Sequence, residues 1–181
     1  MSAVLETRRL ILRAPRAEDV PRFVPLIGDF DVAKKLSSVT YSYTDEDGHG
    51  FVARAAQKWM EKEDLAFCVL RKQDGAFLGI SGVHPKRRRE IGYWLGKAYW
   101  GQEYATEAAG RIVAFSFDEL GAEHLAAGWY HDNPASGRVL EKLGFSTART
   151  EERPCLSRGT PSLTYVVKLD RAAYKTRKNQ L

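Results

Sequence analysis

The stretch from Glu90 to Glu107, EIGYWLGKAYWGQEYATE, most constrains the fold of this chain. A short apolar run, typical of a buried strand, gives way to a turn at Gly101 and then to a helical pattern that begins near Tyr104. The first N–H groups of a helix have no partner within the helix, and the helix dipole places partial positive charge on them. A strand, a turn and a helix in this order therefore predict an anion site suited to phosphate.

Two common nucleotide-binding motifs are absent from this turn. It lacks the Gly-Lys-Ser/Thr ending of an ATP-binding loop, and no Gly-x-Gly-x-x-Gly follows a strand. Helix starts that could hold an anion are far commoner than occupied ones. The residues alone therefore leave two interpretations open, a site for a phosphate-bearing ligand or an ordinary helix start.

A second motif, HDNPASGRVLEKLGF, spans His131 to Phe145. Taken with EIGYWL, WGQEYATEA and the opening TRRLILR at Thr7 to Arg13, it resembles the RimJ/RimL type of the GNAT superfamily of N-acetyltransferases. The resemblance covers residues 7–170, with its parts in the family's order and spacing. It implies the family's fold, acetyl-CoA as co-substrate, and direct transfer of an acetyl group to a primary amine.

We expect a single N-acetyltransferase domain over residues 1–181, because a chain of 181 residues with 44% hydrophobic composition can bury one core. Periodicity and turn residues predict an α/β (α+β) fold with a mostly antiparallel, twisted sheet of about seven strands flanked by helices. The expected strands are 8–13, 65–71, 76–83, 90–95, 124–130, 145–150 and 163–169. The expected helices are 17–27, 44–60 with Trp59 and Met60 in the core, 104–121 and 133–144, and 170–181 is expected to be a fraying tail.

The resemblance also implies where acetyl-CoA binds. Strands Glu90–Leu95 and Leu125–Tyr130 run side by side and splay apart, and the pantetheine arm lies in the gap. The turn 101–106 holds the diphosphate, mainly through backbone N–H groups. For Trp94, a plain core position is an equal alternative. The implied cofactor-binding residues are Trp94, Leu95, Gly101, Gln102, Glu103, Tyr104, Ala105, Thr106, Asn133 and Arg138.

Glu103 departs from the family's pattern, which usually has glycine at this point of the turn. A carboxylate beside a diphosphate repels it, and any residue other than glycine narrows the accessible backbone angles. We therefore expect the side chain of Glu103 to point to solvent and its N–H group to point inward.

Three residues of the second motif each allow two interpretations. Asn133 and Ser136 are ordinary choices for a helix start, whereas the resemblance assigns Asn133 to the cofactor arm and Ser136 to the leaving thiolate. Arg138 meets either the adenosine phosphates or only solvent. The tyrosine that many family members use as general acid corresponds to Leu140, so the acid is Ser136, Tyr130, water or none.

The general base is expected to be Glu90 or His131. A histidine has an unperturbed pKa of about 6.5, which suits a base at neutral pH, whereas a glutamate at about 4.3 needs burial to raise it. Each residue also has a structural or solvent-facing interpretation. Cys68 and Cys155 show no metal-ligand spacing and are expected to be free thiols, so neither a metal site nor a covalent route is predicted.

The net charge is +5, and the cluster Lys86–Arg89 is its most visible part. The cluster is either a solvated loop or a contact for phosphate groups, RNA or an acidic protein surface. The chain has no apolar run near the length of about 20 residues that a membrane span needs, which predicts a cytoplasmic protein.

Two other functions compete with the enzyme. One is an acyl-CoA sensor without catalysis, favoured by Glu103 and by Leu140, and the other is an RNA-associated or ribosome-associated binding module. For the enzyme we expect an amine acceptor, either a peptide N-terminus or a small molecule. We expect no nucleic-acid or membrane partner, and a monomer or homodimer.

Overall fold

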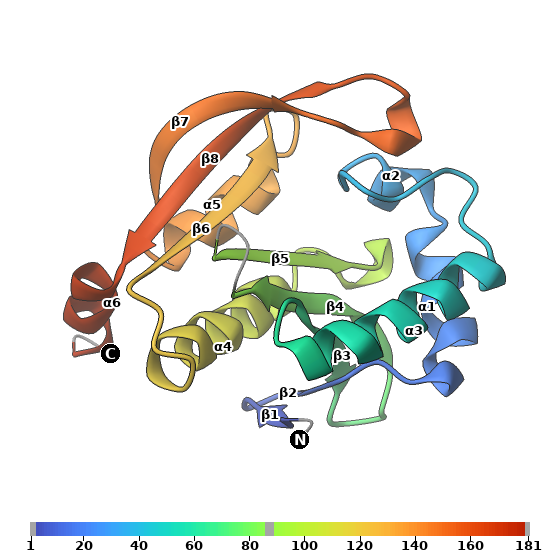
Figure 1. The fold of residues 1–181 in the computed structure, drawn as a ribbon, viewed down its shortest axis with the longest axis horizontal. Coiled ribbons are helices and arrows are strands. Elements are labelled where there is room, and N and C mark those ends of the chain that lie inside the picture. The colour runs from blue at the N-terminus through green and yellow to red at the C-terminus, as the bar shows by residue number, and fades with distance from the viewer. Residues whose placement is uncertain (1–2, 86–88, 180–181) are drawn as a thin grey trace.

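The structure is a computed structural model that describes residues 3–85 and 89–179 (Figure 1). Its 8-stranded sheet has the order β1-β2-β3-β4-β5-β6-β8-β7, and β5 and β6 form a parallel pair within otherwise antiparallel neighbours. The mixed, mostly antiparallel sheet is confirmed, with the short β1 as an addition. The strands are β1 (Leu5–Glu6), β2 (Leu10–Arg13), β3 (Leu65–Arg71), β4 (Phe77–His84), β5 (Glu90–Leu95), β6 (His124–Tyr130), β7 (Ser146–Arg153) and β8 (Ser162–Asp170).

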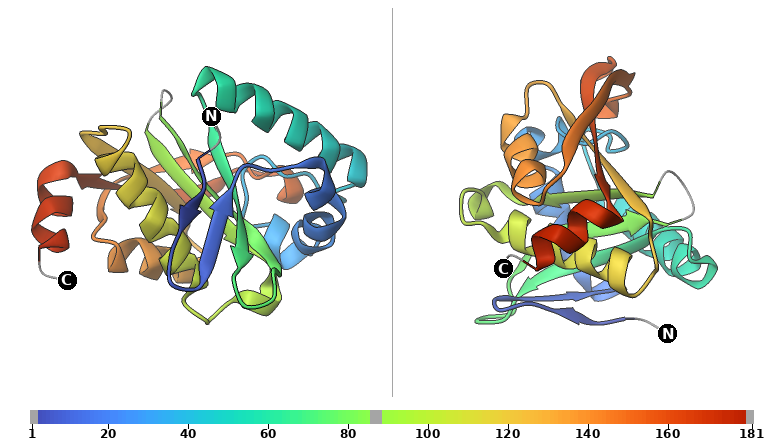
Figure 2. Two further views of the ribbon diagram at one scale, coloured as in Figure 1. Left: turned by 90° about the horizontal axis from the view of Figure 1, so that it is seen from below. Right: turned by 90° about the vertical axis from the view of Figure 1, so that its left-hand side faces the viewer.

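Helices cover both faces of this sheet (Figure 2). One core lies under α4 and includes Phe67 and Ile112, and a second lies under α1 and α3 and includes Phe23 and Ile80. No helix in the described part of the chain is both long and apolar enough to cross a membrane. The helices are α1 (Val20–Ile27), α2 (Phe30–Ala33), α3 (Asp45–Glu61), α4 (Tyr104–Asp118), α5 (Pro134–Lys142) and α6 (Arg171–Lys178), with 3-10 turns at Ala17–Asp19, Lys97–Tyr99 and Leu156–Arg158.

Two local predictions from turn and cap residues are confirmed. Gly75 supplies a φ of +70° in the β3–β4 hairpin, where the N–H of Arg71 donates to the carbonyl of Ala76 at 2.9 Å. Thr44 caps α3, because its hydroxyl accepts from the N–H of Asp47 at 3.2 Å and the Asp47 carboxylate accepts from the N–H of Thr44 at 2.9 Å. Short-range chemistry thus fixes both elements.

Two features differ from expectation. Met60 is 79% exposed on the outer face of α3, whereas Trp59 packs against the core. Successive residues of a helix point about 100° apart, and this rotation takes Met60 out of the buried face that Trp59 occupies. The segment expected to fray forms α6, where the ring of Tyr174 stacks on Phe117 at 4.6 Å and its hydroxyl donates to Asp118 at 2.8 Å.

The strands β5 and β6 separate soon after they meet, as Figure 1 shows. Among the described residues, their register contains one pair, Glu90 with Ala126, and the N–H of Ala126 donates to the carbonyl of Arg89 at 2.9 Å. Beyond this pair the backbones diverge and share no ladder. The expected splay between two central strands is confirmed.

Candidate active site

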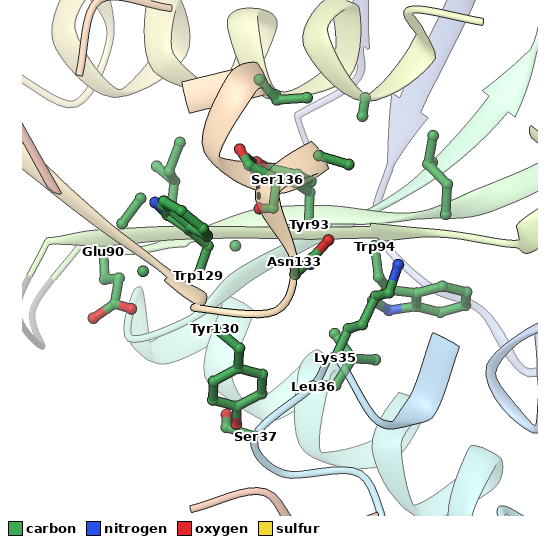
Figure 3. Close-up of a pocket in the computed structure, with 18 of the residues that line it drawn as sticks. Lys35, Leu36, Ser37, Glu90, Tyr93, Trp94, Trp129, Tyr130, Asn133 and Ser136 are labelled. Atoms are coloured by element: carbon green, nitrogen blue, oxygen red, sulfur yellow. Dashed lines mark hydrogen bonds between the residues drawn. The ribbon is translucent and has the colours of Figure 1, made fainter. Parts of the chain in front are cut away.

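A cavity of about 1210 Å³ follows the gap between β5 and β6 (Figure 3). Its walls come from β5 and the turn after it, the starts of α4 and α5, β6, the end of β7, and the segment after α2. Pockets for drug-sized ligands hold about 300–1,000 Å³, so this cavity has room for a long ligand and a second molecule. Gln102 and His131 lie outside its described lining. The other predicted residues line it: Glu90, Trp94, Leu95, Gly101, Glu103, Tyr104, Ala105, Thr106, Asn133, Ser136 and Arg138.

Side-chain alternation along β5 gives the cavity two sides. Tyr93 packs toward the core under α4, whereas Glu90, Gly92 and Trp94 face the side of α1 and α3. A Cβ added to Gly92 would meet no atom within 4 Å, so the floor between Glu90 and Trp94 is open. Figure 3 shows Ser136 and Tyr93 on one side of β5, and Glu90, Trp94, Tyr130 and Lys35 on the other.

The start of α4 is an uncapped helix N-terminus that opens into the cavity. Its N-cap residue, Glu103, has a left-handed conformation (φ 62°, ψ 8°), and the side chain makes no capping hydrogen bond. The N–H groups of Tyr104, Ala105 and Thr106 therefore have no partner within the helix and carry the positive end of its dipole. This arrangement fits a phosphate or diphosphate group.

The side chain of Glu103 turns away from these N–H groups and pairs with α5. Oε1 accepts a hydrogen bond from Nζ of Lys142 at 2.6 Å, and Oε2 accepts one from the hydroxyl of Thr106 at 2.9 Å. The bond from Lys142, helped by that from Thr106, holds the pKa of Glu103 below its ordinary value. The outward orientation expected from the sequence is present, and the carboxylate in addition has a cationic partner.

Arg9, between β1 and β2, braces the same turn. Its Nε donates to Glu107 at 2.6 Å, its Nη1 donates to the carbonyl of Gln102 at 3.1 Å, and its guanidinium lies 4.3 Å from the ring centroid of Tyr104. Burial would raise the pKa of Glu107, but hydrogen bonds from Thr7 and Arg9 outweigh it and lower the pKa. Part of the opening motif therefore shapes the turn from behind, a role that the sequence did not indicate.

The start of α5 places three predicted residues at the cavity. Asn133 is the N-cap residue, but its side chain makes no capping hydrogen bond, so the local alternative for this residue does not apply. The hydroxyl of Ser136 lies 2.9 Å from Oη of Tyr93, and Arg138 is exposed on the wall. Leu140, at the position of the family's tyrosine, is 1% exposed and belongs to the core under α4.

Glu90 pairs with Arg153 at the end of β7. Both side chains are 17% exposed, and the guanidinium donates from Nη1 to Oε1 and from Nη2 to Oε2 at 3.3 Å. Arg153 lies across β6 because Gly128 has no side chain, and a Cβ there would come within 2.9 Å of Nη1. Burial would lower the pKa of Arg153, but its hydrogen bonds to Glu90 and Glu151 raise it. The pair orients the Glu90 carboxylate.

His131, the second expected base, is exposed after β6, and its backbone N–H donates to the carbonyl of Leu163 at 2.9 Å. The structure does not bring it into the cavity with Glu90. Cys68 and Cys155 are buried, free and outside the cavity lining, and burial raises the pKa of Cys68.

Lys35, just after α2, and Tyr130, at the end of β6, complete the side of the cavity that holds Glu90. Nζ of Lys35 lies 4.0 Å from the ring centroid of Trp100, and burial lowers the pKa of Lys35. The hydroxyl of Tyr130 donates to the carbonyl of Pro154, and burial raises the pKa of Tyr130. No motif or spacing marks Lys35 or Arg153 in the sequence, because both enter through loops and strand ends distant along the chain.

The connection between β7 and β8 is bonded to the segment after α2. The N–H of Leu156 donates to the carbonyl of Ser37 at 3.3 Å, and Nε of Arg158 donates to the carbonyl of Lys34 at 2.7 Å. Arg158 also pairs with Asp132 at 2.8 Å. Figure 1 shows this connection above α2. The connection therefore helps to hold in place the segment after α2, of which Ser37 lines the cavity.

Of the basic cluster, Arg89 alone lies within the described part of the chain. Lys86, Arg87 and Arg88 lie outside the described residues, so both interpretations of the cluster stay predictions. Arg89 is exposed, with a φ of 49°. Within residues 3–85 and 89–179, no group of three or more His, Cys, Asp or Glu side chains is placed to hold a metal ion.

The sequence profile described as "Acetyltransferase (GNAT) domain" matches residues 9–146, more than half of the chain. The chain belongs to the GNAT acetyltransferase family. A relative of this GNAT enzyme is the uncharacterized N-acetyltransferase YoaA of Bacillus subtilis, which is 28% identical over 170 residues that span 92% of this chain and 96% of YoaA.

Solved structures share the fold of this GNAT enzyme. The ribosomal α-N-protein acetyltransferase RimL, in complex with coenzyme A, superposes with a TM-score of 0.82 at 16% identity and covers 94% of this chain and 99% of its own. The self-immunity acetyltransferase MccE, in complex with acetyl-CoA and AMP, has a TM-score of 0.78 at 15% identity and covers 91% and 93%. The family, fold and enzyme class expected from the sequence are confirmed.

Proposed function

We propose that this GNAT enzyme transfers an acetyl group from acetyl-CoA directly to a primary amine while both substrates are bound. The observation that carries the proposal is the uncapped start of α4, which opens into the same cavity that Ser136 and Glu90 line. RimL and MccE, which share the fold, are in complex with coenzyme A and acetyl-CoA. Acetyl-CoA is the co-substrate.

The chain offers contacts along the whole length of such a ligand. The N–H groups of residues 104–106 bind the diphosphate, with Arg138 and Lys142 on α5 nearby for phosphate charge. The side chain of Asn133 and the backbone of Trp94 line the path of the arm. Acetyl-CoA supplies the activated acyl group as a thioester.

The transfer needs a neutral amine, donors for the oxyanion, and a partner for the leaving sulfur. Glu90 accepts the proton of the incoming ammonium, directly or through a water, from the orientation that Arg153 imposes. The edge of β5 that faces the gap offers backbone N–H groups to the developing negative charge. The hydroxyl of Ser136 donates a hydrogen bond to the departing sulfur.

The acceptor is either a protein N-terminus or a small-molecule amine. Position in the cytoplasm and a monomeric or homodimeric state stay predictions.

A panel of amines, including short peptides with varied N-termini and small primary amines, tests the proposal. Thiol release reports turnover, and mass spectrometry of the acceptor reports acetylation. We expect at least one class to gain an acetyl group in step with release of coenzyme A. Tight binding of acetyl-CoA without transfer to any amine would favour the sensor instead.

A further inference from the structure

Tyr93 connects β5 to α5 across the gap in which the acyl group would lie. Its Oη lies 2.9 Å from Oγ of Ser136 and 3.0 Å from the carbonyl oxygen of Ser136. We propose that Tyr93 is a positioning residue for acetyl transfer, which acts by fixing the hydroxyl of Ser136. The inference rests on the proposed function, because that function gives Ser136 its bond to the leaving sulfur.

The contact between Tyr93 and Ser136 lies in the part of the gap where no described strand pairing connects β5 to its neighbour. The pairing of β5 with β6 consists of Glu90 with Ala126 in the described residues, so no ladder sets the distance between β5 and α5 beyond that point. Tyr93 comes after Glu90 along β5, and Ser136 comes after Ala126 in the chain, on α5. The dashed line in Figure 3 joins the two side chains above β5. The hydroxyl pair therefore links the two walls directly.

The surroundings of Tyr93 favour positioning over proton donation. The ring packs against the core under α4. Burial raises the pKa of Tyr93 to about 12, against a smaller opposite effect of the bond with Ser136. A thiol has a pKa of about 8.5, so proton transfer from such a phenol to a thiolate is unfavourable by a factor of more than about a thousand. Tyr93 therefore keeps its proton throughout the reaction.

A fixed hydroxyl has a direct consequence for Ser136. A serine hydroxyl carries one proton and two acceptor lone pairs, and its side chain can rotate among three staggered positions. The phenol of Tyr93 has one proton, which it can direct to the carbonyl oxygen or to Oγ of Ser136. When this proton is directed to Oγ, it occupies an acceptor position there, one rotamer is selected and the serine proton is available to the cavity. This matters more in a chain whose α5 carries the buried Leu140 in place of a tyrosine.

A double-mutant cycle on kcat tests the proposal. Tyr93→Phe keeps the ring packing and removes the tie, and Ser136→Ala removes the hydroxyl that it fixes. We expect each variant to lower kcat about tenfold, the effect of one hydrogen bond, with the KM of the amine unchanged. Because Tyr93 acts through Ser136, the double variant should be no slower than Ser136→Ala alone. Tyr174→Phe, which loses a bond to Asp118 on α4 away from the cavity, is the matched control and should keep the wild-type kcat.

The outcomes separate this inference from the proposed function. An active wild type with unchanged kcat in Tyr93→Phe overturns the positioning role alone, as does a double variant whose loss equals the product of the two single losses. A lower melting temperature without a kinetic change would assign Tyr93 a purely structural role. A wild type that acetylates no amine overturns both the proposed function and the inference that rests on it.

Discussion

Oε1 of Glu103 lies 2.6 Å from Nζ of Lys142, and this ion pair joins the start of α4 to α5 beside the proposed diphosphate site. Both side chains are more than half exposed, so solvent screens the pair and it stabilises the fold little. The carboxylate nevertheless holds a lysine that a diphosphate could use. Binding of the co-substrate should therefore compete with this pair.

Glu103→Gln should tighten binding of acetyl-CoA roughly two- to fivefold, because it removes one negative charge at a helix N-terminus and frees Lys142. Glu103→Gly should tighten it at least as much, since glycine also suits the φ of 62° at this position. Isothermal titration calorimetry at low and high salt measures both effects. Unchanged affinity in both variants would show that the carboxylate does not oppose the diphosphate.

Arg9→Met should weaken binding of acetyl-CoA about three- to tenfold, although we expect no direct contact between Arg9 and acetyl-CoA. The variant removes the bonds of Arg9 to Glu107 and Gln102, and the turn loses the brace that aims its N–H groups. Arg8→Met, at an exposed neighbouring position, is the control for the loss of one positive charge. Equal losses in the two variants would indicate a general effect of charge and contradict the brace.

Asn133→Ala should raise the KM of acetyl-CoA while leaving the free energy of unfolding nearly unchanged, because the side chain makes no capping hydrogen bond. Thr44→Ala removes a side chain that does cap a helix, and should cost about 0.5 to 2 kcal/mol without a kinetic effect. Urea unfolding and steady-state kinetics of both variants separate the two roles. An unstable Asn133→Ala with normal kinetics would return Asn133 to its local role.

Glu90→Gln should lower kcat by roughly a hundredfold or more, the usual effect of losing a general base, because Glu90 lines the cavity. His131→Ala, outside the lining, should change kcat less than about twofold. Rates measured from pH 6 to 9 compare the variants over the range in which amines lose protons. A larger loss in His131→Ala than in Glu90→Gln would reverse this assignment of the base.

Asp19 holds the start of α1 through a buried carboxylate. Arg13 donates two hydrogen bonds to it, each 2.7 Å long, and the N–H of Arg16 donates a third at 2.9 Å. Burial would raise the pKa of Asp19, but the bonds from Arg13 and Arg16 outweigh it, and the folded pKa lies below the ordinary value of 3.8. A lowered folded pKa stabilises the protein above the unfolded value, and this stability is lost as the pH falls through the folded value.

Asp19→Asn should therefore lower the free energy of unfolding by about 2 to 3 kcal/mol at pH 7, because Arg13 loses its ionic partner. The difference in free energy of unfolding between wild type and variant should shrink below about pH 4, as the wild-type carboxyl gains its proton. Urea unfolding at pH 7 and pH 3 checks both statements. Glu141→Gln, at an exposed carboxylate on α5, is the control and should change stability little. An equal difference in free energy of unfolding at both pH values would contradict the lowered pKa of Asp19.

Elements whose causes are local could be predicted from the sequence. The cap at Thr44 and the turn at Gly75 depend on residues within a few positions of each other, and both occur where expected. The gap between β5 and β6 was predicted from the family resemblance alone, because no periodicity in either strand indicates that the two backbones diverge. The exposed Met60 shows the limit of an apolar pattern that is broader than the buried face.

The pairs that shape the site could not be predicted, because their members are far apart in the chain. Tyr93 and Ser136 are separated by 43 positions, and Glu90 and Arg153 by 63. Alternation along β5 indicates which face each side chain takes but not what lies opposite. For the same reason His131 and Glu90 are equivalent in the sequence, although one lies on an exposed loop and the other in the cavity.

A crystal structure of the protein with coenzyme A would show whether the start of α4 binds the diphosphate. We expect diphosphate oxygens about 2.7 to 3.2 Å from backbone nitrogens of residues 104–106, the arm between β5 and β6, and the sulfur on the side of Ser136. Coenzyme A bound elsewhere, or a gap filled by side chains while the ligand occupies another surface, would contradict this prediction.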